Sequence, residues 1–82
     1  MGEKDAVIAA RIEKDIALFY SNFSKLKVDS KTKKLAELSE MYARDSKSYL
    51  EKGDYYTSFS CISYAHGLLD AVLSMESEEN VR

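Results

Sequence analysis

The fold is set by the segment Glu51-Lys52-Gly53-Asp54 and the run behind it, Tyr55-Tyr56-Thr57-Ser58-Phe59-Ser60-Cys61-Ile62-Ser63-Tyr64-Ala65-His66-Gly67-Leu68-Leu69-Asp70-Ala71. Gly53 is placed to end one helix in the left-handed conformation that glycine adopts at low cost. Asp54 can then accept hydrogen bonds from the first free N–H groups of the next helix. No formal charge lies between Asp54 and Asp70, which is typical of a helix covered on more than one side. The segment therefore predicts a helical hairpin whose second helix is the most buried element.

Apolar side chains recur at steps of three and four through most of the chain, as in amphipathic helices. Residues 3–26 carry Ile8, Ile12, Ile16, Phe19, Phe23 and Leu26. Residues 31–52 follow a break at residues 28–30 and place Leu35, Leu38, Tyr42 and Tyr49 on one face, with the small Ser46 between the tyrosines. Residues 54–75 carry Tyr55, Phe59, Ile62, His66, Leu69 and Leu73. The acidic segment 76–82 lacks periodicity, so we expect a frayed tail there.

Three helices with short connections predict an all-α fold, an up-down-up antiparallel three-helix bundle that forms one domain over residues 1–82. The absence of proline from the 82 residues agrees with this. A net charge of −2 argues neither for a strong nucleic-acid binder nor for disorder, and no apolar run approaches the length of a membrane span. The lone cysteine, Cys61, excludes an internal disulfide and suits a reducing compartment. We therefore expect a cytoplasmic protein with a buried, unreactive thiol.

The chain resembles a known family at Glu51-Lys52-Gly53-Asp54-Tyr55 and at Ile62-Ser63-Tyr64-Ala65-His66-Gly67-Leu68-Leu69-Asp70-Ala71. These residues are similar to the signature of the small archaeal domain of unknown function 357, with specific likeness over Ala43 to Val72. Ser58 stands where that family usually has alanine. The resemblance implies a three-helix bundle in an archaeal, cytoplasmic protein. Because the function of that family is not established, the resemblance implies no active site.

Two other helical classes share part of the pattern. The turn at residues 52–55 is similar to that of tetratricopeptide repeats, but a single unit cannot form a solenoid and no second copy occurs. HEPN nucleases present an arginine and a histidine a few residues apart. Here the nearest arginine before His66 is Arg44, which argues against that class.

His66 is the only histidine, and Asp70 lies four residues later on the same helical face. Asp70 could orient the imidazole ring or raise its pKa. A catalytic role would also need a third group and a cleft, which the sequence does not supply. We therefore predict no catalytic, metal or cofactor-binding residue, and assign structural roles to Gly53, Asp54, His66 and Asp70. The ring is expected to be largely buried and hydrogen-bonded to a carboxylate, a tyrosine or a backbone carbonyl.

A second stripe on the third helix consists of small residues, namely Ser60, Ser63, Gly67, Ala71 and Ser74. Glycine inside a helix costs about 1 kcal/mol relative to alanine, so Gly67 is expected to have a packing reason. The helix carries more apolar and small surface than two neighbours need. This favours a non-catalytic interaction module that forms a homodimer or docks on a partner protein. The predicted surface comprises Tyr56, Ser60, Ser63, Tyr64, Gly67 and Ala71.

The alternative function is a nucleotide- or RNA-binding accessory domain. The only basic patch gathers around the first connection, where Lys33 accompanies four predicted phosphate contacts, Lys25, Lys27, Lys31 and Lys34. Binding through such a patch should weaken steeply with salt. A solvated helix end is the simpler interpretation, so nucleic acid is the less favoured partner.

Overall fold

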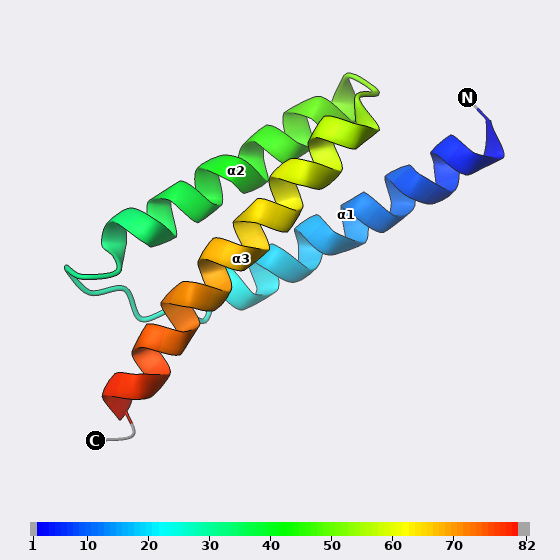
Figure 1. The fold of residues 1–82 in the computed structure, drawn as a ribbon. Coiled ribbons are helices and arrows are strands. Elements are labelled where there is room, and N and C mark those ends of the chain that lie inside the picture. Colours follow the sequence, from blue (N-terminus) through cyan, green and yellow to red (C-terminus); the bar gives the residue numbers. More distant parts are fainter. Residues whose placement is uncertain (1, 81–82) are drawn as a thin grey trace.

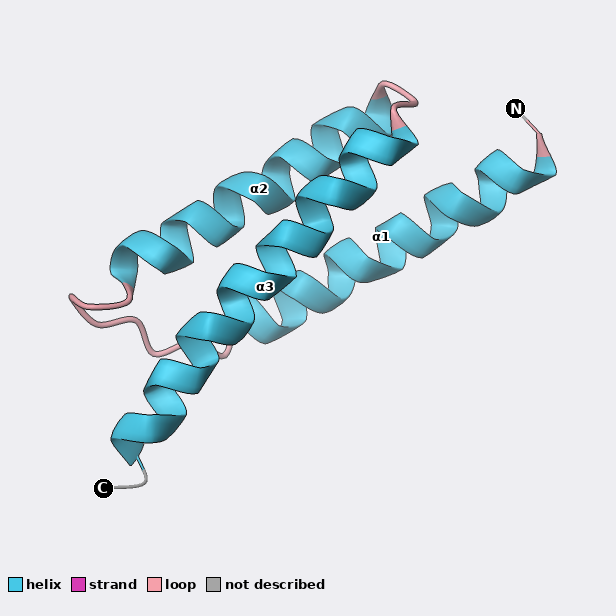
Figure 2. Cartoon of the chain, viewed as in Figure 1, coloured by secondary structure: helices cyan, strands magenta, loops and turns pink. Residues whose placement is uncertain are grey.

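The computed structural model describes residues 2–80, with side chains described through residue 76. It contains three helices, α1 (Glu3–Phe23), α2 (Lys33–Glu51) and α3 (Tyr55–Asn80). They run up, down and up and pack together, with no strand among the described residues (Figures 1 and 2). This arrangement confirms the predicted all-α, antiparallel three-helix bundle.

Helix α3 is longer than the sequence pattern indicated. It continues to Asn80, through most of the segment expected to fray, while residues 81–82 lie outside the described part of the chain. Glutamate is a good helix former, and several glutamates occupy this segment. The carboxylate of Glu76 also accepts a hydrogen bond from the backbone N–H of Lys27 at 3.1 Å. This contact ties the extended end of α3 to the connection between α1 and α2.

The hairpin between α2 and α3 has the geometry that its sequence predicts. Gly53 adopts φ of 79° in the left-handed region. Its backbone N–H donates a hydrogen bond to the carbonyl oxygen of Leu50, and the N–H of Asp54 donates one to the carbonyl oxygen of Tyr49. The nitrogen–oxygen distance is 3.0 Å in both. These two bonds form a Schellman motif, which satisfies the last free carbonyls of α2. The Asp54 carboxylate then accepts the N–H of Thr57 at 3.1 Å and caps α3.

The connection between α1 and α2 is organised by Asp29. Its carboxylate accepts the backbone N–H groups of Lys31 and Thr32 at 2.9 and 3.0 Å, and the Thr32 hydroxyl at 3.2 Å. Thr32 is buried, so this turn fixes where α2 begins. Helix α2 consequently starts at Lys33, two residues later than expected. Helix α1 ends three residues early, at Phe23.

The largest buried apolar side chains of the core come from α1 and α3. Ile12 and Phe19 from α1 are buried against Ile62, Ala65 and Leu69 from α3. Ile16, Tyr20, Phe23, Leu26 and Leu73 are partly buried around this cluster. The stripes predicted for α1 and for the second half of α3 therefore supply most of the core.

Helices α2 and α3 pack most closely, through small side chains. The buried line of α2 is Ala36, Ser39, Ala43 and Ser46. The larger apolar residues expected to form that face (Leu35, Leu38, Tyr42 and Tyr49) are only half-buried and flank the line. Small residues let two helix backbones approach, which leaves the bulky side chains at the margins of the contact. The predicted role of Ser46 in close approach is confirmed by its bond to the carbonyl of Ser58 at 2.7 Å.

Two core predictions were wrong, at the open end of the bundle. Phe59 is 50% exposed and Ile8 is 43% exposed, although both lie on the expected apolar stripes. The first turns of α1 diverge from the hairpin (Figure 1) and are exposed through Ile8. The bundle is correspondingly elongated, with extents of 51 × 19 × 16 Å. Helix α3 contacts both neighbours and is the central element, but it keeps one face open.

Candidate functional site

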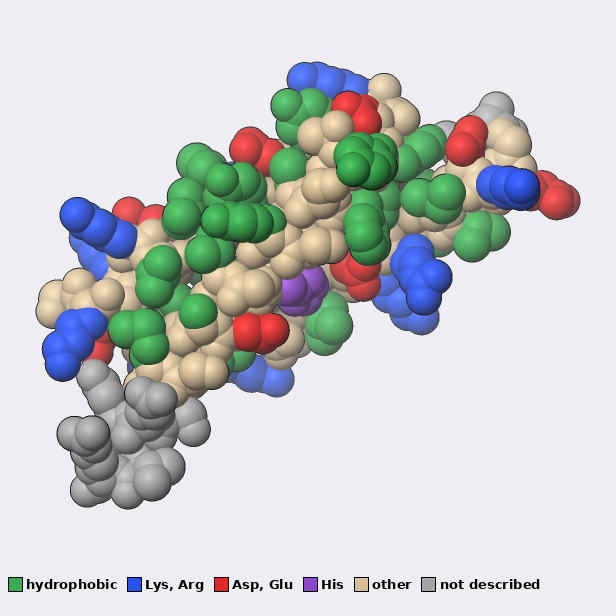
Figure 3. All heavy atoms as spheres, viewed as in Figure 1, with side chains coloured by type: hydrophobic (Ala, Val, Ile, Leu, Met, Phe, Trp, Pro, Cys, Tyr) green, Lys and Arg blue, Asp and Glu red, His purple; other side chains and the backbone are tan. Residues whose placement is uncertain are grey.

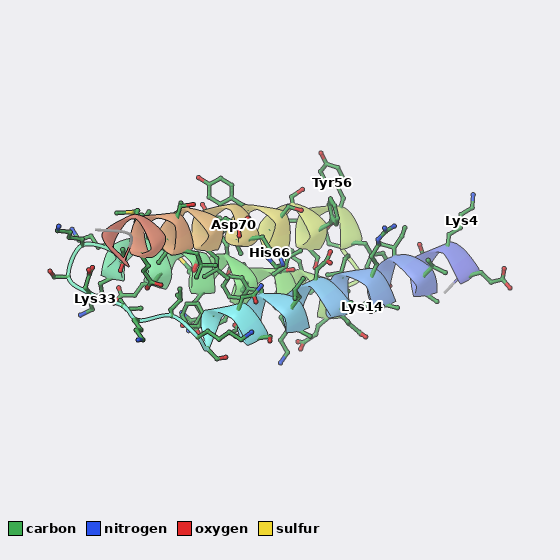
Figure 4. All side chains as sticks on the ribbon, turned by 90° about the horizontal axis from the view of Figure 1, so that it is seen from below. Lys4, Lys14, Lys33, Tyr56, His66 and Asp70 are labelled. Carbon is green, nitrogen blue, oxygen red and sulfur yellow. The ribbon has the colours of Figure 1, made fainter. Side chains whose placement is uncertain are left out.

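The open face of α3 consists of Tyr56, Ser60, Ser63, Tyr64, Gly67 and Ala71, all of which are exposed. Tyr56 is 85% exposed and Tyr64 is 56% exposed. In Figure 4 the Tyr56 side chain points away from α1 and α2. Figure 3 looks onto this side of the molecule, where hydrophobic and neutral side chains occupy the middle and most charged ones lie toward the margins. The structure thus brings the six residues together on one accessible surface.

Gly67 lies in the middle of the open face, where no packing contact within the described chain requires a glycine. A Cβ atom added there would meet nothing within 4 Å. The backbone of Gly67 is not in the left-handed region either, since Gly53 is the only positive-φ residue among those described. The packing role expected for Gly67 is therefore not filled by α1 or α2. Glycine at this position costs helix stability relative to alanine, and open space lies where a Cβ atom would be.

One ring and one hydroxyl of the open face are held in place by contacts within the bundle. The Tyr64 ring packs on Tyr42 of α2, with ring centroids 4.6 Å apart. The Ser60 hydroxyl donates to the carbonyl of Tyr56 at 3.0 Å. The Tyr64 ring and the Ser60 hydroxyl therefore have little side-chain freedom left to lose on contact with an uncharged partner.

Two apolar grooves flank α1, and sequence reasoning did not predict either. The smaller lies between α1 and α3, and it is lined by Ile8, Arg11, Ile12, Tyr55, Tyr56 and Phe59. It explains the exposure of Ile8 and Phe59 and extends the open face toward α1. The only sequence signal was the single apolar stripe of α1, which cannot show where two helices diverge.

The larger groove, about 630 Å³ in volume, lies between α1 and α2 near the hairpin. Its apolar part includes Ile16, Tyr20, Leu50 and Tyr55, and its charged lining residues are Glu13, Arg44, Lys47 and Glu51. Partial burial raises the pKa of Tyr20, with a further contribution from the negative charge of Glu40. The phenol therefore stays neutral and is suited to hydrogen bonding rather than to acid–base chemistry near neutral pH. Side chains of both signs of charge line this groove.

The lysine patch is dispersed around the connection between α1 and α2. Lys25, Lys27, Lys31 and Lys34 are all exposed. A carboxylate lies among them, because Glu76 accepts the backbone N–H of Lys27. Lys33 forms an ion pair along α2 with Glu37, in which Nζ lies 4.0 Å from Oε1. Acidic groups inside the patch reduce the positive potential that a phosphate backbone would meet.

His66 is half-buried rather than largely buried as expected, and Figure 4 shows it between α3 and α1, with Asp70 also on α3. Its Nε2 lies 3.0 Å from the carbonyl oxygen of Asp15, in hydrogen-bonding geometry. The ring also meets Phe19 edge to face, with centroids 5.8 Å apart. Asp70 is exposed and makes no hydrogen bond to the ring within the described part of the chain. The pairing considered for His66 and Asp70 is therefore absent from this structure.

The remaining candidates among the described residues are metal ligands and the thiol of Cys61. No three His, Cys, Asp or Glu side chains among them are placed to hold a metal ion. Cys61 is half-buried rather than buried, and desolvation raises the pKa of its thiol, with smaller contributions from Asp45 and Asp54. A raised pKa leaves less of the reactive thiolate. Within residues 2–76, every buried side-chain nitrogen and oxygen has a hydrogen-bond partner, so none is left directed at a ligand.

The fold and its uncharged open face define a small antiparallel three-helix domain. Residues 12–77 match the family described as Protein of unknown function (DUF357), and the chain belongs to this family. The matched range includes α1 from Ile12 onward, all of α2, and the open face of α3. A comparison with curated proteins found no match. None of the helices, over the residues described, combines the length and apolar character needed to cross a membrane.

Proposed function

We propose that this domain is a non-catalytic interaction module, which docks on another protein surface by helix-to-helix contact through the open face of α3. The observation that carries the proposal is Gly67, an exposed mid-helix glycine with open space where its side chain would lie. Glycine and other small residues at a helix surface let a second backbone approach closely. A docked partner would pack against Gly67, which neither α1 nor α2 does.

The neighbourhood of Gly67 supports the same function. Tyr56 and Tyr64 provide aromatic rings of the kind enriched at the centre of protein interfaces. No charged residue occurs between Asp54 and Asp70, so docking here would require little desolvation of ionic groups. Exposed apolar surface extends the face sideways through Phe59 and Ile8. We retain, as part of this proposal, the cytoplasmic location expected from the single cysteine.

The proposal is tested by placing one charge at the centre of the open face. Gly67→Glu should retain the helical circular dichroism of the wild type, because a Cβ atom added there meets no neighbour within 4 Å. Leu18→Glu is the matched control, since Leu18 is 54% exposed on α1. Both tagged variants and the wild type would be used to capture proteins from the source organism, with the domain itself included among the possible prey.

Every protein that docks on the open face should be lost with Gly67→Glu and kept with Leu18→Glu. Burying an unpaired carboxylate in a helix contact is costly, so one charge is enough to disrupt it. If both variants capture the same proteins as the wild type, and the wild type does not self-associate, the proposed function is wrong.

Nucleic-acid binding has weaker support, because Glu37 and Glu76 lie within the lysine patch. The double variant Lys31→Glu/Lys34→Glu distinguishes the two functions. An interaction module should keep its partner in this variant, with little dependence on salt. An RNA-binding domain should lose its ligand, and wild-type binding should fall steeply between low and high salt.

A further inference from the structure

Resting on the proposed function, we infer that the partner of the open face is a second copy of this chain, docked with its α3 antiparallel to the first. The inference depends on the order of bulky and small residues along the face. Tyr56 and Ser60 occupy the first half, whereas Gly67 and Ala71 occupy the second half. All four lie close to one line along the helix, because their steps of four, seven and four follow its turns.

The spacing of these four residues is symmetric about a point between Ser63 and Tyr64. Tyr56 and Ala71 are equidistant from that point, and so are Ser60 and Gly67. A two-fold axis through this point and perpendicular to the helix makes α3 antiparallel to its copy, and the contact is then isologous. Each Tyr56 ring then faces Ala71 of the second copy, and each Ser60 faces Gly67. The bulky Tyr56 thus meets the small Ala71 in both directions, and the small Ser60 meets Gly67, so the face is complementary to itself.

Charge favours the antiparallel arrangement over a parallel one. Asp70 is the acidic residue that closes the uncharged run. Antiparallel packing separates the two Asp70 carboxylates by about 20 Å along the helix axis, which is more than twice the screening length at physiological salt. Parallel packing would place the same two carboxylates side by side. The absence of charge from the rest of the face removes the repulsion that a copy would otherwise meet.

The available area indicates a weak association. The face from Tyr56 to Ala71 is about 24 Å long, and the molecule measures 19 Å across its second extent. A contact of these dimensions falls below the roughly 800 Å² per partner of a standard interface. The dimer is therefore of the transient class, and its population must be measured at protein concentrations up to about 1 mM.

Single cysteines along the open face test the arrangement. Cys61→Ala removes the native thiol and provides the parent chain. Ser60→Cys, Ser63→Cys and Ser74→Cys then place one thiol each at exposed sites on α3, and Ser48→Cys on α2 is the control. In the antiparallel pair, the two copies of Ser63→Cys lie about 1.5 Å apart along the helix axis. The two copies of Ser60→Cys lie about 10 Å apart, and those of Ser74→Cys about 31 Å apart. Disulfides form readily only where the two Cα atoms come within about 7 Å.

We expect rapid disulfide-linked dimer from Ser63→Cys under mild oxidation, slower formation from Ser60→Cys, and formation from Ser74→Cys no faster than from Ser48→Cys. Equal rates at the three α3 sites would mean a parallel pair and would overturn the arrangement. If disulfides formed at all three sites no faster than at Ser48→Cys, and the protein sedimented as a monomer at 1 mM, the partner would not be a second copy of this chain. The proposed function would survive that result if Gly67→Glu still abolished capture of a different protein, and would fall with it otherwise.

Discussion

Ser46 and Ser58 join α2 to α3 by reciprocal hydrogen bonds, in which each hydroxyl donates to the carbonyl oxygen of the other residue. The two distances are 2.7 and 2.6 Å, and the two hydroxyl oxygens lie 3.1 Å apart. Both side chains are fully buried. This contact holds the two backbones close beside the hairpin, and it positions the first half of α3 so that its opposite face is open.

Loss of either hydroxyl should destabilise the fold. Ser46→Ala and Ser58→Ala are each expected to lower the free energy of unfolding by about 1 kcal/mol, the usual contribution of a buried hydrogen bond. The double variant should lose less than the sum, because the two residues are in direct contact. Urea denaturation measures these values, with the exposed Ser48→Ala as a control that should change little. Unchanged stability in both single variants would contradict this role.

The hairpin glycine should be sensitive to substitution. Gly53→Ala forces an L-residue to a φ of 79° and should cost about 1 kcal/mol or more of unfolding free energy. Gly53→Asn should cost less, because asparagine tolerates the left-handed region. Thermal unfolding gives the order wild type, Asn, Ala from most to least stable. If the alanine variant matched the wild type, the Schellman motif would not be needed to form the hairpin.

Acid should weaken the cap of α3. The side-chain and backbone hydrogen bonds of Thr57 lower the pKa of Asp54 below 3.8. The unfolded chain therefore takes up this proton at a higher pH than the folded chain does, so protonation favours unfolding. The contribution is present above about pH 4 and is lost as pH falls through the folded pKa. Melting temperatures from pH 6 to pH 2 should fall less steeply for Asp54→Asn, whose amide oxygen caps without titrating; parallel slopes would contradict the assignment.

His66 should contribute to stability without help from Asp70. His66→Ala removes the contact with the Asp15 carbonyl and the edge-to-face packing on Phe19, so a loss of about 2 kcal/mol is expected. Asp70→Asn should leave the free energy of unfolding within about 0.5 kcal/mol of the wild type, as exposed substitutions usually do. Chemical denaturation of the two variants in parallel tests both statements. A large loss in Asp70→Asn would show that the carboxylate does act on the fold.

The sequence was sufficient for the fold where local chemistry determines the structure. Gly53 and Asp54 fixed the hairpin because a left-handed turn and a helix cap each require particular residue types. The periodic stripe through Ile12 and Phe19 predicted the core of α1, because the spacing of apolar residues along a helix is also local information. The extension of α3 was missed because Glu76 is held by a residue 49 positions away in the chain, which periodicity cannot reveal.

The candidate site was predicted less evenly. The small residues of α3 identified the open face, because side-chain size and absence of charge are visible in a sequence. Phe59 and Ile8 were misplaced because burial depends on how far α1 diverges from α3, and helix spacing carries no such information. The groove with Tyr20 and Arg44 was missed for that reason too.

The central claim is that the open face of α3 pairs with a second copy of this chain, and that Gly67 makes this contact possible. Sedimentation of the wild type and Gly67→Ala from about 10 µM to 1 mM, paired with their thermal unfolding at low concentration, tests it most directly. Alanine should stabilise the monomer by up to about 1 kcal/mol, because it is the better helix former and meets open space. The same methyl group should weaken dimerisation, because it lies where the second backbone approaches. A more stable chain that associates less is the predicted result; a wild type that stays monomeric to 1 mM, or an alanine variant that associates as well as the wild type, would contradict the claim.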